Sequence, residues 1–432
     1  MSKPERFTHP AAALERAFVA GRHSVSPFNF RPEVTEEFEF PKPLALIDST
    51  IRKVIYTAGI RTSVADLLKI GEILEEIGVK DESLNLWWWG ADEPNSIEWE
   101  ALQAFAKAGF GFRVNVFTDT LVGSGAVPST KMRRTVDMLA ELGVGAINPG
   151  LIEPPDEECA KRQRDEFAAF GEYAKAQGVD WTLTIAHCGR RDFGKMIDGI
   201  NTAIEAGATR LDPMDSTSTM SPEAMKRFVR TVRSLMVKPV PMTMHTHDDF
   251  GMAAATTVAA VTAGASPDVA LNGVSYRSGF AALEEVVLAL DVLYGLDTGI
   301  RLDRLQWAAD SLAKLMDFPI PPLKPVVGSH QFLRDSPADI VKVHALVHPT
   351  FADLGCSIEP GLIGSSLSWV WGEQSSDEVV RQVARGLNLT LPEAQVRAAR
   401  EELNRRRDAK AAYPKWIEPS EVKEVVRTMA NA

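Results

Sequence analysis

Two histidines placed two residues apart give the clearest chemical signal in the chain. His245 ends the apolar run 241–245, and His247 follows two positions later. Side chains two apart on a strand point to the same side, so the two imidazoles could hold a metal ion together. A hydrogen-bonded histidine pair that only shapes the site fits the same spacing. A third ligand would decide between the two interpretations.

An arginine and a lysine follow another apolar run, residues 44–51, in which Asp48 lies. Arg52 carries a planar guanidinium that can bind a carboxylate or an enolate oxygen bidentately. Lys53 could act as a fixed cation that polarises a carbonyl. It could instead be a Schiff-base nucleophile, if burial and Arg52 lower its pKa. An ion pair with a nearby aspartate that merely fills the site is the third interpretation.

Further polar and aromatic residues follow other apolar runs, and we expect several of them at the same site. Tyr276 comes after the run 269–272 and is a candidate proton carrier together with the histidines. Trp88, in a run of three tryptophans, would form an apolar pocket if it faces the site, and core packing is its alternative role. The residues predicted to bind substrate are Asp48, Trp88, Arg190, Asp215, Asp248 and Arg277.

The elements that must position these residues repeat between residues 44 and 293. Short apolar runs alternate with longer amphipathic segments, which is typical of strands followed by crossover helices. We expect strands at 44–51, 84–89, 112–117, 146–148, 181–186, 210–212, 241–245 and 269–272. About eight such units predict an α/β fold, a (β/α)8 TIM barrel, whose active site lies at the carboxyl ends of the strands. A doubly wound sheet is the alternative, but no Gly-x-Gly-x-x-Gly follows the first strand.

The remaining segments differ in pattern from the barrel. Residues 1–43 form a polar arm, residues 44–300 the TIM-barrel domain, and residues 301–432 a mainly helical C-terminal domain that we expect in a dimer contact. Helices are predicted near 305–316, 376–387, 392–407 and 420–429.

Composition excludes several classes of protein. The 432 residues include 47 Lys and Arg against 58 Asp and Glu, a net charge of −11, which argues against nucleic acid as a partner. No apolar run has the roughly 20 residues of a membrane helix, and the polar N-terminus lacks a signal-peptide core. Three scattered cysteines fit a reducing compartment. We therefore expect a cytoplasmic protein without a membrane partner.

Several motifs together resemble the hydroxymethylglutaryl-CoA lyase-like family, which includes isopropylmalate synthase, homocitrate synthase and related aldolases. The matching segments are 48–59, 245–251, 272–286, 324–328 and 358–364. The resemblance implies formation or cleavage of a carbon–carbon bond through an enolate that a divalent metal stabilises. It also implies that the metal ligands are an Asp after the first strand, the two histidines and, in some members, an Asn after the eighth strand.

The chain departs from the family pattern at the metal ligands. Lys53 stands where the family has the Asp, Phe280 stands where it has the Asn, and the family's strand-two Glu falls at or near Trp88. An ammonium about 4 Å from a divalent cation repels it by several kcal/mol at an effective dielectric constant near 20. The expected cofactor is therefore none or a divalent metal ion, with His245 and His247 as ligands only if a metal is retained.

These observations predict a homodimeric enzyme that makes or breaks a carbon–carbon bond, in aldol or Claisen fashion, on a small 2-oxo acid or acyl substrate. The catalytic residues would be Arg52, Lys53, His245, His247 and Tyr276. Two alternatives stay open: a metal-dependent acyltransferase of the isopropylmalate or homocitrate synthase type, and a catalytically inactive barrel that serves as a binding subunit. The expected partner is a small anionic substrate, either a 2-oxo acid or an acyl thioester.

Overall fold

The computed structural model describes residues 8–88, 91–118, 129–336, 356–411 and 416–431, so Trp89 of the tryptophan run lies outside the described residues. The chain divides into two compact units. One comprises Pro32–Pro319, and the other combines Met1–Arg31 with Ile320–Ala432. The functional division at residues 43/44 and 300/301 stays a prediction.

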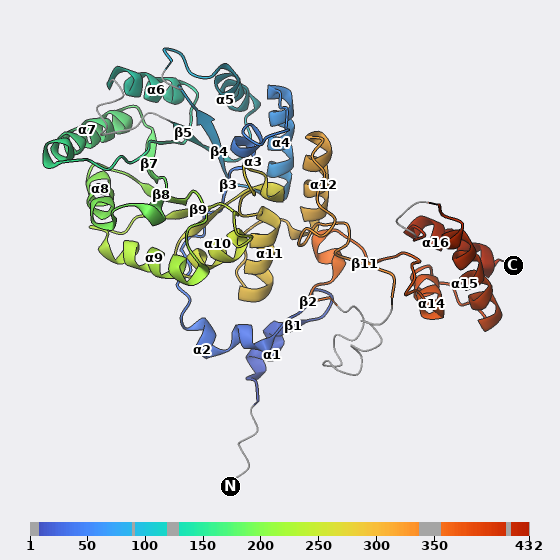
Figure 1. The fold of residues 1–432 in the computed structure, drawn as a ribbon. Helices are drawn as coiled ribbons and strands as arrows, with labels where there is room; N and C mark the ends of the chain where they lie inside the picture. Colours follow the sequence, from blue (N-terminus) through green and yellow to red (C-terminus); the bar gives the residue numbers. More distant parts are fainter. Residues whose placement is uncertain (1–7, 89–90, 119–128, 337–355, 412–415, 432) are drawn as a thin grey trace, which may run out of the picture. The chain divides into compact units, whose positions relative to one another are not determined.

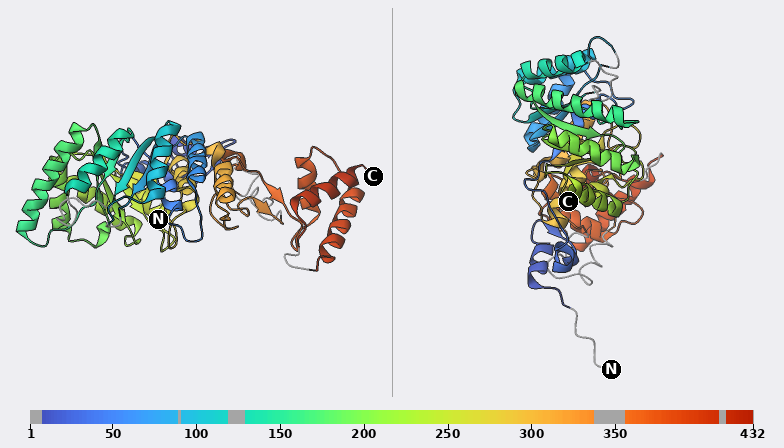
Figure 2. Two further views of the ribbon diagram at one scale, coloured as in Figure 1. Left: turned by 90° about the horizontal axis from the view of Figure 1, so that it is seen from above. Right: turned by 90° about the vertical axis from the view of Figure 1, so that its left-hand side faces the viewer.

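The larger unit is the predicted TIM barrel. Its parallel strands close in the order β10-β3-β4-β5-β6-β7-β8-β9. They are β3 (Ile47–Asp48), β4 (Asp81–Leu86), β5 (Arg113–Thr118), β6 (Ala146–Asn148), β7 (Asp180–Ile185), β8 (Arg210–Asp215), β9 (Thr243–Thr246) and β10 (Ser266–Val269). The helices surround the strands (Figures 1 and 2). They are α4 (Val64–Ile77), α5 (Ser96–Ala108), α6 (Ser129–Glu141), α7 (Glu157–Ala176), α8 (Phe193–Glu205), α9 (Pro222–Leu235), α10 (Ala253–Val261), α11 (Leu283–Tyr294) and α12 (Leu305–Leu315).

Helix α4 illustrates how local sequence sets the element boundaries. Ser63 and Asp66 form a reciprocal capping box at its start, which satisfies two backbone N–H groups that have no partner inside the helix. The helix ends at Gly78, whose φ of 95° lies in the left-handed region that favours glycine. A Cβ there would also lie 2.9 Å from the backbone oxygen of Gly299. The chain can therefore turn directly into β4.

Several strand boundaries differ from the prediction, and those of the first and eighth strands matter most for the site. The first strand ends at Asp48, and residues Thr50–Val54 form the short helix α3. The Asp48 carboxylate accepts a 2.7 Å hydrogen bond from the backbone N–H of Thr50, which stabilises this turn. The eighth strand covers Ser266–Val269, three residues earlier than predicted. This strand contains the polar residues Ser266 and Asp268, so it does not stand out as an apolar run.

The smaller unit contains the predicted C-terminal helices. Helices α14 (Asp377–Gly386), α15 (Glu393–Asp408) and α16 (Pro419–Ala430) enclose a core of valine, tryptophan, leucine and isoleucine side chains. The N-terminal segment pairs with residues beyond the barrel, because Ser24 donates its N–H to Ser357 and Glu359 donates its N–H to Arg22. Among the described helices, none combines the length and the apolar character that crossing a membrane requires.

Candidate active site

Strand register shows which side chains face the barrel interior. Asn85 on β4 is level with Phe117 on β5, and Phe117 is level with Asn148 on β6. On the other side, Asp268 on β10 is level with His245 on β9. Residues at one level of neighbouring parallel strands share a face, so Asn85, Phe117 and Asn148 lie at one level of the barrel interior, and Asp268 and His245 lie together at another.

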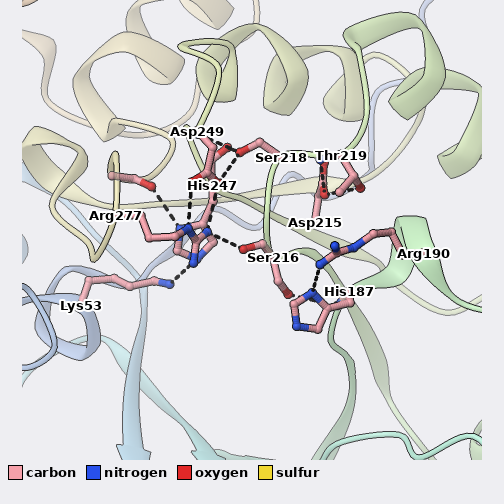
Figure 3. Close-up of polar contacts among 11 residues, drawn as sticks. Lys53, His187, Arg190, Asp215, Ser216, Ser218, Thr219, His247, Asp249 and Arg277 are labelled. Carbon is pink, nitrogen blue, oxygen red and sulfur yellow. Dashed lines mark hydrogen bonds and ion pairs between the residues drawn. The ribbon is translucent and has the colours of Figure 1, made fainter.

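Lys53 reaches from α3 to the two histidines. Its Nζ lies 3.0 Å from Nε2 of His245 and 3.3 Å from Nε2 of His247, and Figure 3 shows Lys53 pointing at His247. Lys53 is 2% exposed, and both histidines are buried. The same Nζ lies 4.5 Å from the centre of the Phe280 ring. The structure thus brings together three of the predicted catalytic residues.

The hydrogen bonds on the far side of each imidazole set its tautomer. Nδ1 of His247 lies 3.1 Å from the carbonyl oxygen of Gly279, which can only accept, so Nδ1 carries the proton. Nδ1 of His245 lies 2.5 Å from the Asp268 carboxylate. Both Nε2 atoms therefore present lone pairs to Lys53, which donates to both. A neutral lysine amine has two N–H groups. If each donates to one imidazole, the nitrogen lone pair points away from both histidines and is available to a substrate.

Burial and charge favour neutral forms throughout this cluster. The pKa of Lys53 is lowered well below its ordinary value, first by burial and then by the charge of Arg52. Burial, followed by the charge of Lys53, also lowers the pKa of His245 and of His247. Burial raises the pKa of Asp268 to about 6, although Arg52 and a 2.7 Å hydrogen bond from Ser49 oppose the shift. An uncharged Lys53 amine is the form that acts as a nucleophile.

Arg52 precedes Lys53 on α3 and contacts Asn85 and Phe117 of the barrel interior. Its Nε donates a 2.9 Å hydrogen bond to Oδ1 of Asn85, and its guanidinium carbon lies 3.7 Å from the centre of the Phe117 ring. Arg52 is 8% exposed. Burial lowers its pKa, while the nearby aspartates Asp268 and Asp212 oppose the shift. Arg52 therefore supplies a positive charge fixed in place over an aromatic ring.

Asp48, Asp215 and Asp248 were predicted to bind substrate, but their carboxylates accept hydrogen bonds from backbone N–H groups. Asp48 is level with Glu82, on the opposite face of the sheet from Asn85, and burial raises its pKa to about 7. The Asp215 carboxylate accepts hydrogen bonds from the N–H groups of Thr219 and Met220. That of Asp248 accepts one from the N–H of Ala253, at the start of α10. These contacts support loops and turns around the site.

The remaining predicted residues lie around the site. Tyr276 is 40% exposed, and its ring centre lies 4.8 Å from that of His247. Arg277 forms an ion pair with Asp249, 2.8 Å from Nε to Oδ1.

Two further predicted contacts involve other residues. Arg190 contacts the exposed His187, a pair that stands apart from Lys53 in Figure 3. The buried Trp88 has its ring 5.4 Å from Arg134 of α6. The structure shows no contact of Arg190 or Trp88 with Lys53 among the described residues.

Several buried polar residues of the barrel interior were not among the predicted site residues. They include Asn85, Asn148, Asp212 and Asp268. Asp268 lay just before the predicted eighth strand, so its place beside His245 was not visible. Asn148 is the last residue of a predicted strand. Because active-site residues of a TIM barrel lie at the carboxyl ends of its strands, its amide could have been predicted as part of the site. Asp212 was predicted as a strand end, and burial raises its pKa to about 8.

The arrangement around Lys53 does not fit the divalent metal that the family resemblance implies. Metal-to-imidazole distances are about 2.0–2.1 Å, so an ion bound by both Nε2 atoms needs the space that Nζ of Lys53 occupies. In the part of the chain that the structure describes, no group of three or more His, Cys, Asp or Glu side chains could hold a metal ion. Lys53 would have to leave both histidines before an ion could enter.

A closed parallel barrel with a lysine, an arginine and two histidines at one end is the architecture of a (β/α)8 enzyme. The family model described as HMGL-like matches residues 158–312. A protein named "Putative (R)-citramalate synthase CimA" from Methanopyrus kandleri is 30% identical over 376 residues, 84% of this chain and 69% of that protein. The chain belongs to the HMGL-like family.

Other relatives agree with this assignment. Homocitrate synthase AksA from the same organism is 28% identical over 403 residues, which cover 93% of this chain and 96% of that protein. The HMG-CoA lyase structure from Bacillus subtilis matches with a TM-score of 0.54 and 16% identity, over 67% of this chain and 98% of that chain. That structural likeness confirms the barrel fold. The synthase relatives confirm the predicted enzyme class, a carbon–carbon lyase or acyltransferase.

Proposed function

We propose that the protein makes or breaks a carbon–carbon bond beside the carbonyl of a small 2-oxo acid, in aldol fashion, through a Schiff base on Lys53. The observation that carries this proposal is the position of Nζ, which donates to both imidazoles at 3.0 and 3.3 Å. The site holds a buried amine where the family pattern has a carboxylate, and this amine can do covalently what a Lewis acid does by coordination.

The chemistry balances with the side chains present. The Lys53 lone pair attacks the 2-oxo carbon, and a proton passes from Nζ to Nε2 of a histidine. That proton returns to the carbonyl oxygen and gives a neutral carbinolamine. A second proton, supplied by solvent, lets the hydroxyl leave as water and gives the protonated imine. In the cleavage direction, Nε2 of a histidine takes the proton of the hydroxyl group of a 4-hydroxy-2-oxo acid as the bond between C3 and C4 breaks. An aldehyde or ketone departs, and the electron pair stays as an enamine. Protonation of C3 and hydrolysis by water release the 2-oxo acid.

The histidines and Arg52 have separate roles in this scheme. His245 is supported at Nδ1 by Asp268, so the carboxylate stabilises the imidazolium that forms when Nε2 takes a proton. His247 contacts Lys53 through Nε2, and its ring packs against the ring of the exposed Tyr276, so in this scheme it is the second acceptor of the Lys53 proton. Arg52 holds the substrate anion beside the amine.

Reductive trapping tests the proposal. Borohydride added to the protein with pyruvate should reduce the imine and leave a 1-carboxyethyl group on Nζ of Lys53, found by peptide mass mapping. Lys226→Met, a change at a surface lysine paired with Glu37, is the matched control and should be trapped like the wild type. Lys53→Arg separates the nucleophile from a fixed cation, because arginine keeps the charge and cannot form the imine. Trapping elsewhere, or full activity in Lys53→Arg, would reject the Schiff base.

A metal-dependent acyltransferase is the second candidate, because relatives carry the names homocitrate synthase and 2-isopropylmalate synthase. Metal analysis of protein purified without a histidine tag tests it. A stoichiometric divalent ion, with thiol release from an acyl thioester that depends on this ion, would favour the acyltransferase. If neither chemistry is detected, and changes at Lys53 alter no measurable activity or phenotype, the binding-subunit alternative gains most.

A further inference from the structure

A set of unpaired polar atoms lies on the side of the barrel away from the histidines. Nη1 of Arg52, Nδ2 of Asn85 and both amide atoms of Asn148 are buried and, within the described residues, have no hydrogen-bond partner. The three side chains are 8%, 2% and 1% exposed. Buried polar groups without partners are rare in native proteins because each costs free energy, so three in one layer indicate a missing ligand.

Strand register places these groups together. Asn85, Phe117 and Asn148 are level on three consecutive strands, which are about 4.8 Å apart in a sheet. The Arg52 guanidinium lies over the Phe117 ring, between the two asparagines, and is bonded to Asn85. Because Oδ1 of Asn85 accepts from Arg52, its amide N–H groups are the free ones. The layer thus presents a positive charge and amide donors above a flat ring.

We propose that Arg52, Asn85 and Asn148 form a carboxylate subsite that selects free 2-oxo acids over neutral carbonyl compounds and acyl thioesters. A planar carboxylate takes N–H donors in its own plane and matches a guanidinium edge. Lys53 follows Arg52 directly on α3, so an acid held there has its 2-oxo carbon close to the amine. That the ligand is a 2-oxo acid rests on the proposed function. That the ligand is an anion follows from the Arg52 and asparagine N–H donors alone.

Oxamate tests the subsite without covalent chemistry, because its amide carbonyl does not form an imine with lysine. Its neutral isostere oxamide is the matched ligand. Calorimetry on the full chain should show binding of oxamate, and oxamide should bind at least tenfold more weakly. Lys53→Met should still bind oxamate, because the donors remain.

Two substitutions test the asparagines. Asn148→Leu removes the amide at similar volume and should weaken oxamate binding by about tenfold to a hundredfold, the range for hydrogen bonds to a charged group. Asn85→Asp keeps the acceptor for Arg52 but places a negative charge beside the ligand, and it should abolish detectable binding. Urea denaturation checks that both variants fold.

The outcomes separate this inference from the proposed function. Oxamate binding that depends on Asn148, combined with no trapping at Lys53, supports the subsite and rejects the Schiff base. Equal binding of oxamate and oxamide, wild-type affinity in both asparagine variants, or no oxamate binding to the wild type overturns the subsite.

Discussion

The core of the C-terminal helices and the interior of the barrel are both fully buried, but they are built on opposite principles. The helical core is apolar, and the indole N–H of Trp371 there donates to Asn404 at 2.9 Å. The barrel interior contains Arg52, Lys53, Asp212 and Asp268 and leaves several polar atoms without partners. Burial of apolar groups stabilises the first region, whereas burial of charged and unpaired polar groups costs stability in the second.

Removal of the buried amine should have the largest effect. Lys53→Met should reduce the exchange of pyruvate methyl protons in D2O, followed by proton NMR, by at least about 10⁴-fold, because the enamine can no longer form. The same variant should match or exceed the wild type in stability to urea, since it replaces a buried polar group with an apolar one. Retention of exchange would show that the barrel interior does not work as proposed.

A substitution in the helical core should reduce stability and leave the chemistry at Lys53 unchanged. Trp371→Ala should cost about 3–5 kcal/mol of stability through the cavity it leaves, measured by urea denaturation followed by tryptophan fluorescence and limited proteolysis. Lys53 trapping should be unchanged in the folded variant, since Trp371 belongs to the other unit. Loss of trapping without loss of stability would contradict this division of labour between the two regions.

Asp268 is a buried residue of the barrel interior that, in the proposed scheme, acts through its hydrogen bond with His245. Asp268→Asn should lower the exchange rate by about 100-fold or more, as an amide can donate to Nδ1 and favour the wrong imidazole tautomer. The expected signature is a changed pH profile of kcat with little change in oxamate affinity. If only stability changes, the role of Asp268 is structural.

The effect of Asp212 should fall on stability, and it should depend on pH. Its folded pKa of about 8 lies above the ordinary 3.8, so between these values the folded state binds a proton that the unfolded state has lost. Stability therefore falls as pH rises from about 4 to 8, by at most about 1.4 kcal/mol per pH unit for this group. Asp212→Asn should flatten that slope in urea denaturation series at pH 5 and pH 8. An unchanged slope would assign the pH dependence to other groups.

Much of the fold could be predicted from the sequence, and the site only in part. The alternation of apolar runs with amphipathic segments predicted the barrel because it depends on local sequence alone. The motif around His245 and His247 predicted the two imidazoles. Asn85, Asn148 and Asp268 escaped because their importance depends on register between strands that are distant in the chain. Asp48 was expected to bind substrate, and the structure places it on the other face of its strand.

The fixed tautomers of the two histidines have an evolutionary consequence. Gly279 and Asp268 hold each Nδ1 whatever stands at position 53, so the imidazole lone pairs serve a metal ion or an amine equally well. If Lys53 acts as proposed, a substitution at that position would change how this site activates a carbonyl while the supports of both imidazoles stay in place.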